Sequence, residues 1–376
     1  MQTSTLESQS GHAARRADFD KIIIVADDLT GACDSGVAFL ASGRSVRVIL
    51  DATQFNSDRT HRYSESVLAI TTETRHSTQE QATERVVATL TPFIAEPSCP
   101  LLFKKVDSAA RGHFAAEIMA ALHASRAALA LVAPAFPHAG RTVRDGILEI
   151  RDASGQHTTI PLRPLFSEID DAHIAVLSPG SEGPIEQALN AGTRILLCDA
   201  QTQEDLESLV AAAYSTDQPI LWAGSAGLAR ALAAVLPASR SVAPEPIPRR
   251  VGRTVLFCGT DHPVTTLQVS HLREQPNSPQ HAIYRVDSQS QETIRDSFGA
   301  APVASLVLTG GDTAAFVLRA LDASSIVLAG EISPGIPWGV IHGGLADGCV
   351  VVTKSGGFGE QDALTRAFEF CDRRAL

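Results

Sequence analysis

Short apolar runs alternate with longer amphipathic segments along almost the whole chain. The runs predict buried strands, at Ile22–Ala26, Val46–Leu50, Val67–Ile70, Leu101–Lys105, Ala130–Ala133, Ile174–Leu177, Ile195–Cys198 and Ile220–Ala223. Most of the intervening segments have helical periodicity, for example Gln79–Leu90, Ala115–Ser125, Glu182–Asn190 and Gln203–Tyr214. Strands that alternate with helices in this way are typical of a largely parallel sheet. We therefore expect an α/β fold.

The alternation stops after Leu236. Residues 237–250, PASRSVAPEPIPRR, contain four prolines and predict an extended linker. A second alternating series starts at Thr254–Cys258 and continues to the C-terminus. Because 376 residues are many for one core, two domains are expected. We predict a disordered tail at 1–19, an α/β domain at 20–237, a Pro-rich linker at 238–250 and a second α/β domain at 251–376, both with largely parallel sheets.

The composition is that of a soluble globular protein, with 44% apolar and 19% charged residues. A net charge of −11 argues against a nucleic-acid partner, which normally needs a basic surface, although a site for a small anion can be locally basic. No segment approaches the ~20 apolar residues of a membrane-spanning helix. Residues 1–18 lack the apolar core of a signal peptide. The six cysteines have no C-x-x-C spacing and are interpreted as buried reduced thiols, so a cytoplasmic location is expected.

Two glycine-rich turns follow apolar runs in the C-terminal part of the chain. The first, Thr309-Gly310-Gly311-Asp312-Thr313, leads into a predicted helix, and the second is Thr353-Lys354-Ser355-Gly356-Gly357-Phe358-Gly359. Glycine lets an anion approach backbone N–H groups, and a helix N-terminus carries partial positive charge. Together the turns predict a nucleotide phosphate site, although ordinary turn chemistry is the alternative for either one alone. Neither turn matches the P-loop or G-x-G-x-x-G patterns.

Two adjacent carboxylates, Asp27 and Asp28, come directly after the strand predicted at Ile22–Ala26. Neighbouring like charges repel each other and must be solvated or paired. One carboxylate could serve as a general base toward a hydroxyl while the other binds substrate hydroxyls or a metal. A helix N-cap at Asp28 or Thr30 is the structural alternative.

Charged and small polar residues also lie at the ends of three other predicted strands. They are Lys104, Lys105, Asp107 and Arg111 at one strand, His138 and Arg141 after another, and Ser225 after a third. Ligands bind beyond the carboxyl ends of parallel strands, so these residues are candidates for the same site as Asp27 and Asp28. Arg111 could grip a carboxylate with two hydrogen bonds, and a lysine could offset phosphate charge. Solvated loops are the alternative for these segments.

Seven segments, in order along the chain, resemble the four-carbon acid sugar kinases. They are ADDLTGACD (26–34), KKVDSAARG (104–112), APAFPHAGR (133–141), AGSAGLARAL (223–232), LTGGDTAAFVL (308–318), GEISPGIPWG (330–339) and TKSGGFGEQDAL (353–364). The resemblance implies an N-terminal sugar-acid domain, a C-terminal nucleotide domain and an active site in the cleft between them. ATP with Mg²⁺ would phosphorylate the terminal hydroxyl, O4, of threonate, erythronate or 3-oxo-tetronate. A homodimer is one expected assembly.

The resemblance also assigns residues to each substrate. The sugar acid would face Asp27, Asp28, Lys105, Asp107, Arg111 and Arg141. ATP would lie against Gly310, Gly311, Asp312, Thr313 and Gly356, with Thr260 in the first turn of the C-terminal domain. Backbone amides of 310–313 and 356–359, which include Gly357 and Gly359, would hold the phosphates, with Lys354 as a counter-charge. Asp27 or Asp28 would orient or deprotonate O4, and the metal ligands are left unassigned.

The chain departs from the family pattern near the sugar site. Ala109-Ala110 stands where Thr-Leu is usual, and His113 where Asn is frequent, which predicts different substrate contacts there. The alternative function is a catalytically weak or inactive family member that binds a sugar acid or a nucleotide. An unrelated nucleotide-dependent enzyme that uses a Gly-Gly-Asp turn would leave the cluster around Asp27 and Asp28 unexplained.

Overall fold

The computed structural model describes residues 21–52, 63–94, 100–151, 155–181, 184–216, 218–239, 250–275, 282–287 and 289–375. The tail predicted at 1–19 lies outside these residues, as does most of the linker predicted at 238–250. No helix in the described ranges has both the length and the apolar character that a membrane crossing requires. Residues 21–239 are called the N-terminal half below, and residues 250–375 the C-terminal half.

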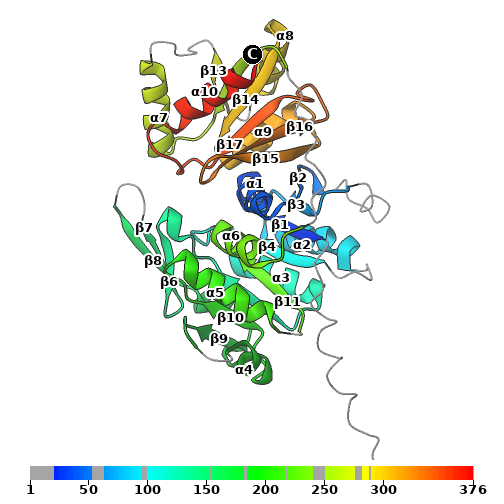
Figure 1. Ribbon diagram of the computed structural model, residues 1–376, viewed down its shortest axis with the longest axis vertical. Coiled ribbons are helices and arrows are strands. Elements are labelled where there is room, and N and C mark those ends of the chain that lie inside the picture. Colours follow the sequence, from blue (N-terminus) through cyan, green and yellow to red (C-terminus); the bar gives the residue numbers. More distant parts are fainter. Residues whose placement is uncertain are drawn as a thin grey trace, which may run out of the picture.

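One sheet of 14 strands runs through the described residues (Figure 1), in the order β13-β12-β14-β17-β16-β15-β2-β3-β1-β4-β11-β5-β10-β9. The N-terminal half contributes β1 (Ile22–Ala26), β2 (Val46–Ile49), β3 (Val67–Thr71), β4 (Leu101–Lys105), β5 (Leu129–Ala133), β9 (Ile174–Leu177), β10 (Ile195–Cys198) and β11 (Ile220–Gly224). The C-terminal half contributes β12 (Arg253–Cys258), β13 (Ile283–Arg285), β14 (Val303–Thr309), β15 (Ser325–Ser333), β16 (Ile336–His342) and β17 (Val350–Lys354).

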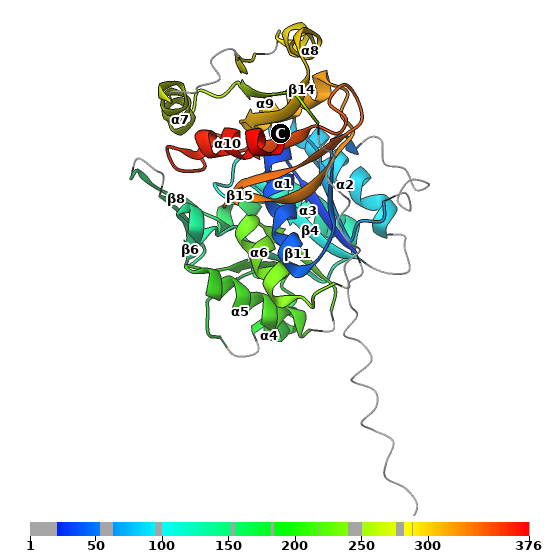
Figure 2. The same ribbon diagram turned by 45° about the horizontal axis from the view of Figure 1, so that its top comes forward.

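Helices flank the sheet in both halves (Figures 1 and 2). Those of the N-terminal half are α1 (Leu29–Val37), α2 (Gln79–Ile94), α3 (Phe114–Ser125), α4 (Pro184–Asn190), α5 (Gln203–Tyr214) and α6 (Ala226–Val235). Those of the C-terminal half are α7 (Pro263–Glu274), α8 (Gln291–Ala300), α9 (Gly311–Ala320) and α10 (Ala363–Ala375). Short 3₁₀ helices lie at Ala38–Ser42, Pro137–Ala139, Arg163–Phe166 and Asp171–His173.

Within the 14-stranded sheet, the strands of the N-terminal half pair with one another in parallel. Their sequences explain this, because central strands such as β1 (IIIVA) and β5 (LALVA) are apolar at every position and buried along their whole length. Strands covered on both faces need continuous apolar runs rather than alternation. In the C-terminal half, β13, β12, β14 and β17 are also parallel. The predicted α/β fold with largely parallel pairing is confirmed.

The two halves join edge to edge through β2 and β15. These strands pair antiparallel, with Val48 opposite Ile326, and Arg47 donates a 2.9 Å hydrogen bond to Ser325 Oγ. Because β15 pairs antiparallel with β16, and β16 pairs antiparallel with β17, the parallel strands of the two halves run in opposite senses. A flat sheet would then place their carboxyl ends on opposite edges. Residues that follow strands of both halves nevertheless line one cavity. β15 has register shifts at Leu328/Gly330 and Glu331/Ser333, and such irregularities bend a strand and increase its twist.

The predicted elements of the N-terminal half agree closely with the structure. All eight predicted strands are present, with ends that differ by at most one residue, and the helix predicted at Gln203–Tyr214 is α5. The predicted start of α4 at Glu182 lies outside the described residues. A small antiparallel sheet of β6 (Arg141–Arg144), β7 (Ile147–Arg151) and β8 (His157–Pro161) was not predicted. Its strands are short, polar and largely exposed, so they give no clear apolar run.

Candidate active site

Asp27 and Asp28 lie where β1 ends and α1 begins. Asp28 is the N-cap of α1, since its Oδ1 accepts a 2.9 Å hydrogen bond from the Gly31 N–H. Its Oδ2 accepts a 2.6 Å bond from Thr30 Oγ1. Both aspartates are 4% exposed. Helix capping therefore accounts for part of the Asp28 geometry, but it does not account for a second buried carboxylate beside it.

Arg75, in the loop after β3, contacts three carboxylates at once. Its Nε and Nη2 lie 2.8 Å and 2.7 Å from Asp27 Oδ2. Its Nη1 lies 3.1 Å from Asp28 Oδ2, and its Nη2 lies 3.4 Å from Asp107 Oδ2. The planar guanidinium thus offsets the mutual repulsion of the three acids through charge-assisted hydrogen bonds.

The pKa values of the two adjacent aspartates are shifted in opposite directions. Burial is the largest effect on both, and it raises the pKa of Asp27 above its usual value despite the charge of Arg75. At Asp28, burial is outweighed by the charges of Arg75 and Lys105 and by the Thr30 hydrogen bond, so its pKa is lowered. Asp28 is therefore the member of the pair that is ionised most readily.

The residues after β4 form the next part of the site. Arg111 donates from Nε and Nη2 to the two oxygens of Asp107, at 3.0 Å and 2.6 Å. Burial opposes ionisation of Asp107, but Arg111 and Arg75 outweigh it and lower the pKa of Asp107. Lys105 donates to the Val106 carbonyl at 2.8 Å. The Arg111 side chain is 64% exposed, so much of its guanidinium faces open space.

A cavity of about 690 Å³ lies between the two halves. The predicted site residues on its N-terminal wall are Asp28, Lys105, Asp107, Arg111, Arg141 and Ser225, and those on its C-terminal wall are Thr260, Gly310, Gly311, Asp312, Thr313, Gly356 and Gly357. Sheet order explains the gathering, because β3, β1, β4 and β11 are consecutive neighbours, as are β12, β14 and β17. The carboxyl ends of neighbouring parallel strands share one edge.

Gly311, the first residue of α9, brings the first glycine turn against Asp28. A Cβ on Gly311 would lie 2.7 Å from Asp28 Oδ2 and 3.1 Å from Thr30 Oγ1, a space that only glycine leaves open. Gly310 precedes it with φ 98°, a backbone conformation that suits glycine. No side chain caps the start of α9. The free end of this helix, a suitable position for an anion, therefore borders the Asp28 carboxylate.

Thr260 lies between the two glycine turns. The Cβ positions of Gly310 and Gly356 would lie 3.2 Å from its Cβ and 3.1 Å from its Oγ1, respectively. Its Oγ1 also accepts a 3.2 Å hydrogen bond from the His262 N–H. The structure therefore brings together three turns that are far apart in the sequence.

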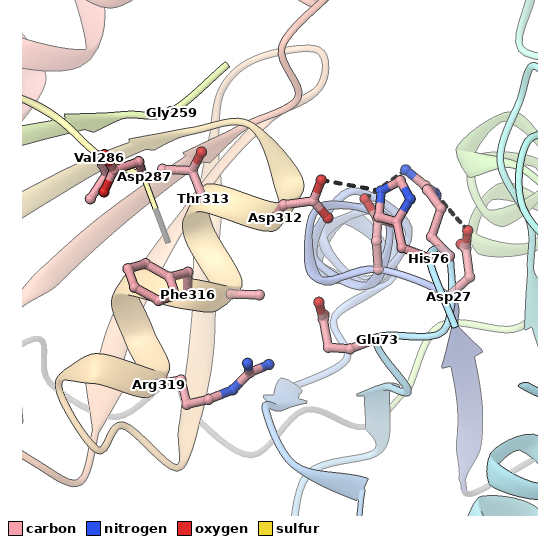
Figure 3. A pocket seen from close by; sticks show the side chains of 13 residues that line it. Asp27, Glu73, His76, Gly259, Val286, Asp287, Asp312, Thr313, Phe316 and Arg319 are labelled. Carbon is pink, nitrogen blue, oxygen red and sulfur yellow. Dashed lines mark hydrogen bonds and ion pairs between the residues drawn. The ribbon is translucent and has the colours of Figure 1, made fainter. Parts of the chain in front are cut away.

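An adjoining cavity of about 410 Å³ is lined by Asp27, Glu73, Asp287, Asp312, Phe316 and Arg319, among others (Figure 3). At its edge His76 Nε2 lies 3.3 Å from Asp312 Oδ2, which joins the two halves. Glu73 has a positive φ of 48°, and burial raises its pKa to about 7. Figure 3 shows Asp312 on the first turn of α9, facing His76.

Four predicted site residues do not line the large cavity. Asp27 lines only the adjoining one. Lys104 is buried in β4, where its Nζ pairs with Glu117 Oε2 at 2.7 Å. Lys354 is 1% exposed and donates to backbone carbonyls of the second glycine turn, and burial lowers its pKa to about 7. Gly359 has φ 84° and packs against Ala363. Direct ligand contact by Lys104 and Lys354 is therefore disfavoured, because their amines are already engaged elsewhere.

Several cavity residues were missed from the sequence. Arg75 and His76 follow the strand predicted at Val67–Ile70. Because ligands bind beyond the carboxyl ends of parallel strands, the position of these two residues is the signal that could have found them. Phe358 was also missed, although its ring lies 6.0 Å from that of Phe136 and 5.8 Å from the Arg141 guanidinium carbon. These contacts join the second glycine turn to the N-terminal half, and no sequence signal indicates them.

Two family models match the chain, a sugar-binding N-terminal domain over residues 22–232 and a nucleotide-binding C-terminal domain over residues 198–364. The chain is 33% identical over 390 residues to the D-threonate kinase of Bordetella bronchiseptica, covering 92% of this chain and 96% of that protein. It is 30% identical to the D-threonate kinase of Salmonella typhimurium, with 94% and 98% covered. The chain belongs to the four-carbon acid sugar kinase family. It is therefore a sugar-acid kinase, and the resemblance seen in the sequence is confirmed.

Solved structures agree with this kinase fold. A Bordetella bronchiseptica protein, described as a domain of unknown function with bound citrate and as a domain-swapped dimer, is 28% identical with a TM-score of 0.50, covering 94% of this chain and 98% of that chain. A Salmonella typhimurium protein provisionally named a tRNA synthase has a TM-score of 0.68 at 20% identity, covering 92% and 98%. The second likeness supports the fold alone. In this kinase, then, the sugar-binding model matches the half with Asp28, and the nucleotide-binding model matches the glycine turns.

Proposed function

We propose that this kinase transfers the γ-phosphoryl group of ATP to the terminal hydroxyl, O4, of a four-carbon sugar acid, with D-threonate as the preferred substrate. The observation that carries the proposal is the single cavity in which the Asp28 carboxylate borders the free N-terminus of α9 at Gly311. D-Threonate is chosen because the relatives at 30% identity or more carry that name.

The nucleotide phosphates bind the C-terminal wall in this proposal. Gly310 and Gly311 leave room for phosphate oxygens near the first amides of α9. Thr260 and Gly356 border the same space from the neighbouring turns. Mg²⁺ usually keeps several waters and takes one or two carboxylates in addition to phosphate oxygens. Asp312 fits that role, since its side chain is 74% exposed at the cavity. Among the described residues, no group of three or more His, Cys, Asp or Glu side chains is placed to hold a metal ion.

The sugar acid binds the N-terminal wall. The Arg111 side chain is largely exposed, and the N–H groups that do not bond Asp107 can donate to the substrate carboxylate, while Asp107 holds the orientation of the guanidinium. Lys105 and Arg141 add positive charge along the same wall. Ala109, where a larger polar residue is usual in the family, lines the cavity and leaves extra space beside the acid.

The proposed chemical step is an in-line transfer. Asp28 accepts the proton from O4 as O4 forms a bond to the γ-phosphorus, while the bond from that phosphorus to the β,γ-bridging oxygen breaks and ADP leaves. Positioning and charge stabilisation supply most of the rate enhancement in such reactions. The low pKa of Asp28 keeps it ionised and able to orient the hydroxyl.

A substrate panel tests the proposal. D-Threonate, L-threonate, D-erythronate and 3-oxo-tetronates are each incubated with ATP and Mg²⁺, ADP release is followed, and the product is analysed by ³¹P and ¹³C NMR. Phosphorylation of D-threonate at O4 is expected. Binding of these acids without any ADP release would favour the alternative of an inactive family member, and a product phosphorylated at another hydroxyl would contradict the O4 assignment.

The remaining sequence predictions stay proposals. We propose a domain boundary within 238–250, supported by the end of the sugar-binding match at residue 232 and the start of β12 at Arg253. A homodimer is proposed because the 28% identical Bordetella protein is described as a domain-swapped dimer. Light scattering of the purified chain tests it. A cytoplasmic location is proposed from five buried free cysteines among the described residues.

A further inference from the structure

Three buried side chains hold the second glycine turn from the side opposite the cavity. Lys354 Nζ donates to the carbonyls of Ser355, Gly356 and Phe358, at 2.8, 3.2 and 3.2 Å. Thr265 Oγ1 donates to the Gly356 carbonyl at 2.7 Å, and Gln268 Nε2 donates to the carbonyls of Phe358, Gly359 and Glu360 at 3.0, 2.9 and 2.9 Å. We call Lys354, Thr265 and Gln268 the clamp; they are 1%, 0% and 0% exposed.

The clamp determines where the amides of the turn point. In a planar trans peptide the C=O of one residue and the N–H of the next point in opposite directions. Because the Ser355 and Gly356 carbonyls point toward Lys354, the N–H groups of Gly356 and Gly357 point away from it. Gly356 and Gly357 both line the large cavity, whereas Lys354, Thr265 and Gln268 do not. Two consecutive N–H groups are therefore directed into the cavity, close to Thr260.

The charge of Lys354 has no partner of opposite sign. No carboxylate among the described residues acts on it; burial lowers the pKa of its amine to about 7, and the Cys258 thiol opposes this shift. Around Nζ lie three carbonyl oxygens and Thr265 Oγ1, which accepts at 3.3 Å and donates its own proton to Gly356. Four acceptors suit an ammonium with three N–H donors better than a neutral amine with two. An anion held by the turn would favour the charged form of this amine, because a nearby opposite charge raises the pKa of a lysine.

We propose that the clamp shapes Gly356 and Gly357 into a phosphate-binding surface, with Lys354 as a positioning residue rather than a direct ligand of the nucleotide. The inference rests on the proposed function, since it assigns the nucleotide phosphates to this turn. It differs from the sequence expectation, in which Lys354 meets the phosphate as a counter-charge. Thr265 and Gln268 on α7 become part of the nucleotide site without touching it.

The test compares Lys354→Met and Thr265→Val with the wild-type full chain. Thr265→Ser keeps the hydroxyl, and Thr254→Val is the matched control because Thr254 is a buried threonine of the same half that bonds Asp372 at 2.9 Å, outside the cavity lining. Two readouts are taken: hydrogen exchange of peptides covering 355–362 in nucleotide-free protein, and ADP affinity by calorimetry. KM values for ATP and for the acid are measured in parallel.

Both clamp variants are expected to speed exchange at 355–362 by about fivefold or more, the scale of one lost hydrogen bond, and to weaken ADP binding by a similar factor. KM for the acid should change less than KM for ATP, and Thr265→Ser and Thr254→Val should behave as wild type. Loss of ADP binding in Lys354→Met alone, with unchanged exchange in both variants, would instead make Lys354 a direct ligand and overturn the proposal.

The two proposals can fail separately. If no acid is phosphorylated but the clamp variants still loosen the turn and weaken ADP binding, the proposed function is wrong and the clamp stands. If the wild-type acts as a kinase while both variants keep wild-type exchange and ADP affinity, the clamp is wrong and the function stands. Wild-type protein that binds no ADP would overturn both.

Discussion

The Asp28 carboxylate and Gly311 meet across the boundary between the two halves of the molecule. A Cβ on Gly311 would lie 2.7 Å from Asp28 Oδ2, so the carboxylate occupies the space that a side chain at 311 would need. In the proposed function, Asp28 serves the acceptor hydroxyl and the turn at Gly311 serves the donor phosphate, so both roles would depend on this one contact. A substitution at either residue changes the position of the other.

Gly311→Ala is expected to lower kcat by about 10²-fold, since displacing a reacting group by roughly 1 Å costs on that scale. Steady-state kinetics with the preferred acid measure the effect. Gly299→Ala in α8 is the control, because a Cβ there meets nothing within 4 Å. The control should keep full activity, and a Gly311→Ala enzyme that retained more than a third of wild-type kcat would contradict the proposed contact.

Asp28→Asn should reduce turnover by about 10²-fold or more, the scale of a lost general base. Asparagine is a good N-cap, so the start of α1 and the fold should survive. Circular dichroism and ADP binding check that the variant is intact. Near-normal turnover in this folded variant would remove Asp28 from the chemical step.

Arg75→Met is expected to destabilise the protein by about 3–5 kcal/mol, because it leaves buried carboxylates without their shared cation. Denaturant unfolding measures the loss. Arg366→Met removes an exposed pair with Asp362 and should cost about 1 kcal/mol or less. Adding Asp27→Asn to Arg75→Met should recover part of the stability, since one of the repelling charges is then absent. Equal losses of unfolding free energy in Arg75→Met and Arg366→Met would argue against the role of Arg75.

Asp34→Asn is expected to stabilise the protein relative to wild type. This gain in the free energy of unfolding should be larger at neutral pH than at pH 4. Burial raises the pKa of Asp34 to about 6, and its Oδ1 accepts no hydrogen bond within the described structure. As pH rises from about 4 to 6, the unfolded chain loses this proton before the folded protein does, so wild-type stability falls across that window. The variant has no carboxyl group at this position and does not lose stability in this way. Above pH 6 its free energy of unfolding should exceed that of wild type by about 2–3 kcal/mol. Thermal melts at pH 4 and pH 7.5 give the comparison, and a difference that does not depend on pH would contradict it.

Much of the site could be predicted from the chain because the relevant residues follow apolar runs that become adjacent parallel strands. Asp28, Lys105 and Gly311 are all found at strand ends, and the edge rule brings them together. Arg75 obeys the same rule, because it follows the carboxyl end of β3. The pattern thus indicates which residues share an edge, but not the hydrogen bonds they make there.

Other features depend on contacts that leave no local pattern. Lys104 and Lys105 are neighbours in sequence, but alternation along β4 sends one toward Glu117 and the other toward the cavity. The sequence of the segment does not indicate which of the two lysines faces the cavity. The contact of Phe358 with Phe136 depends on how the halves meet, and the pairing of β2 with β15 is one of the contacts that join them. Local periodicity carries no information about that antiparallel junction.

The junction between β2 and β15 has a mechanical consequence. Two bodies joined only by a flexible connector can separate as rigid units, but here a backbone hydrogen-bond ladder crosses from one to the other. A movement of one half relative to the other would therefore strain this ladder, and the pairing of β15 with β16 is already interrupted between Leu328 and Gly330.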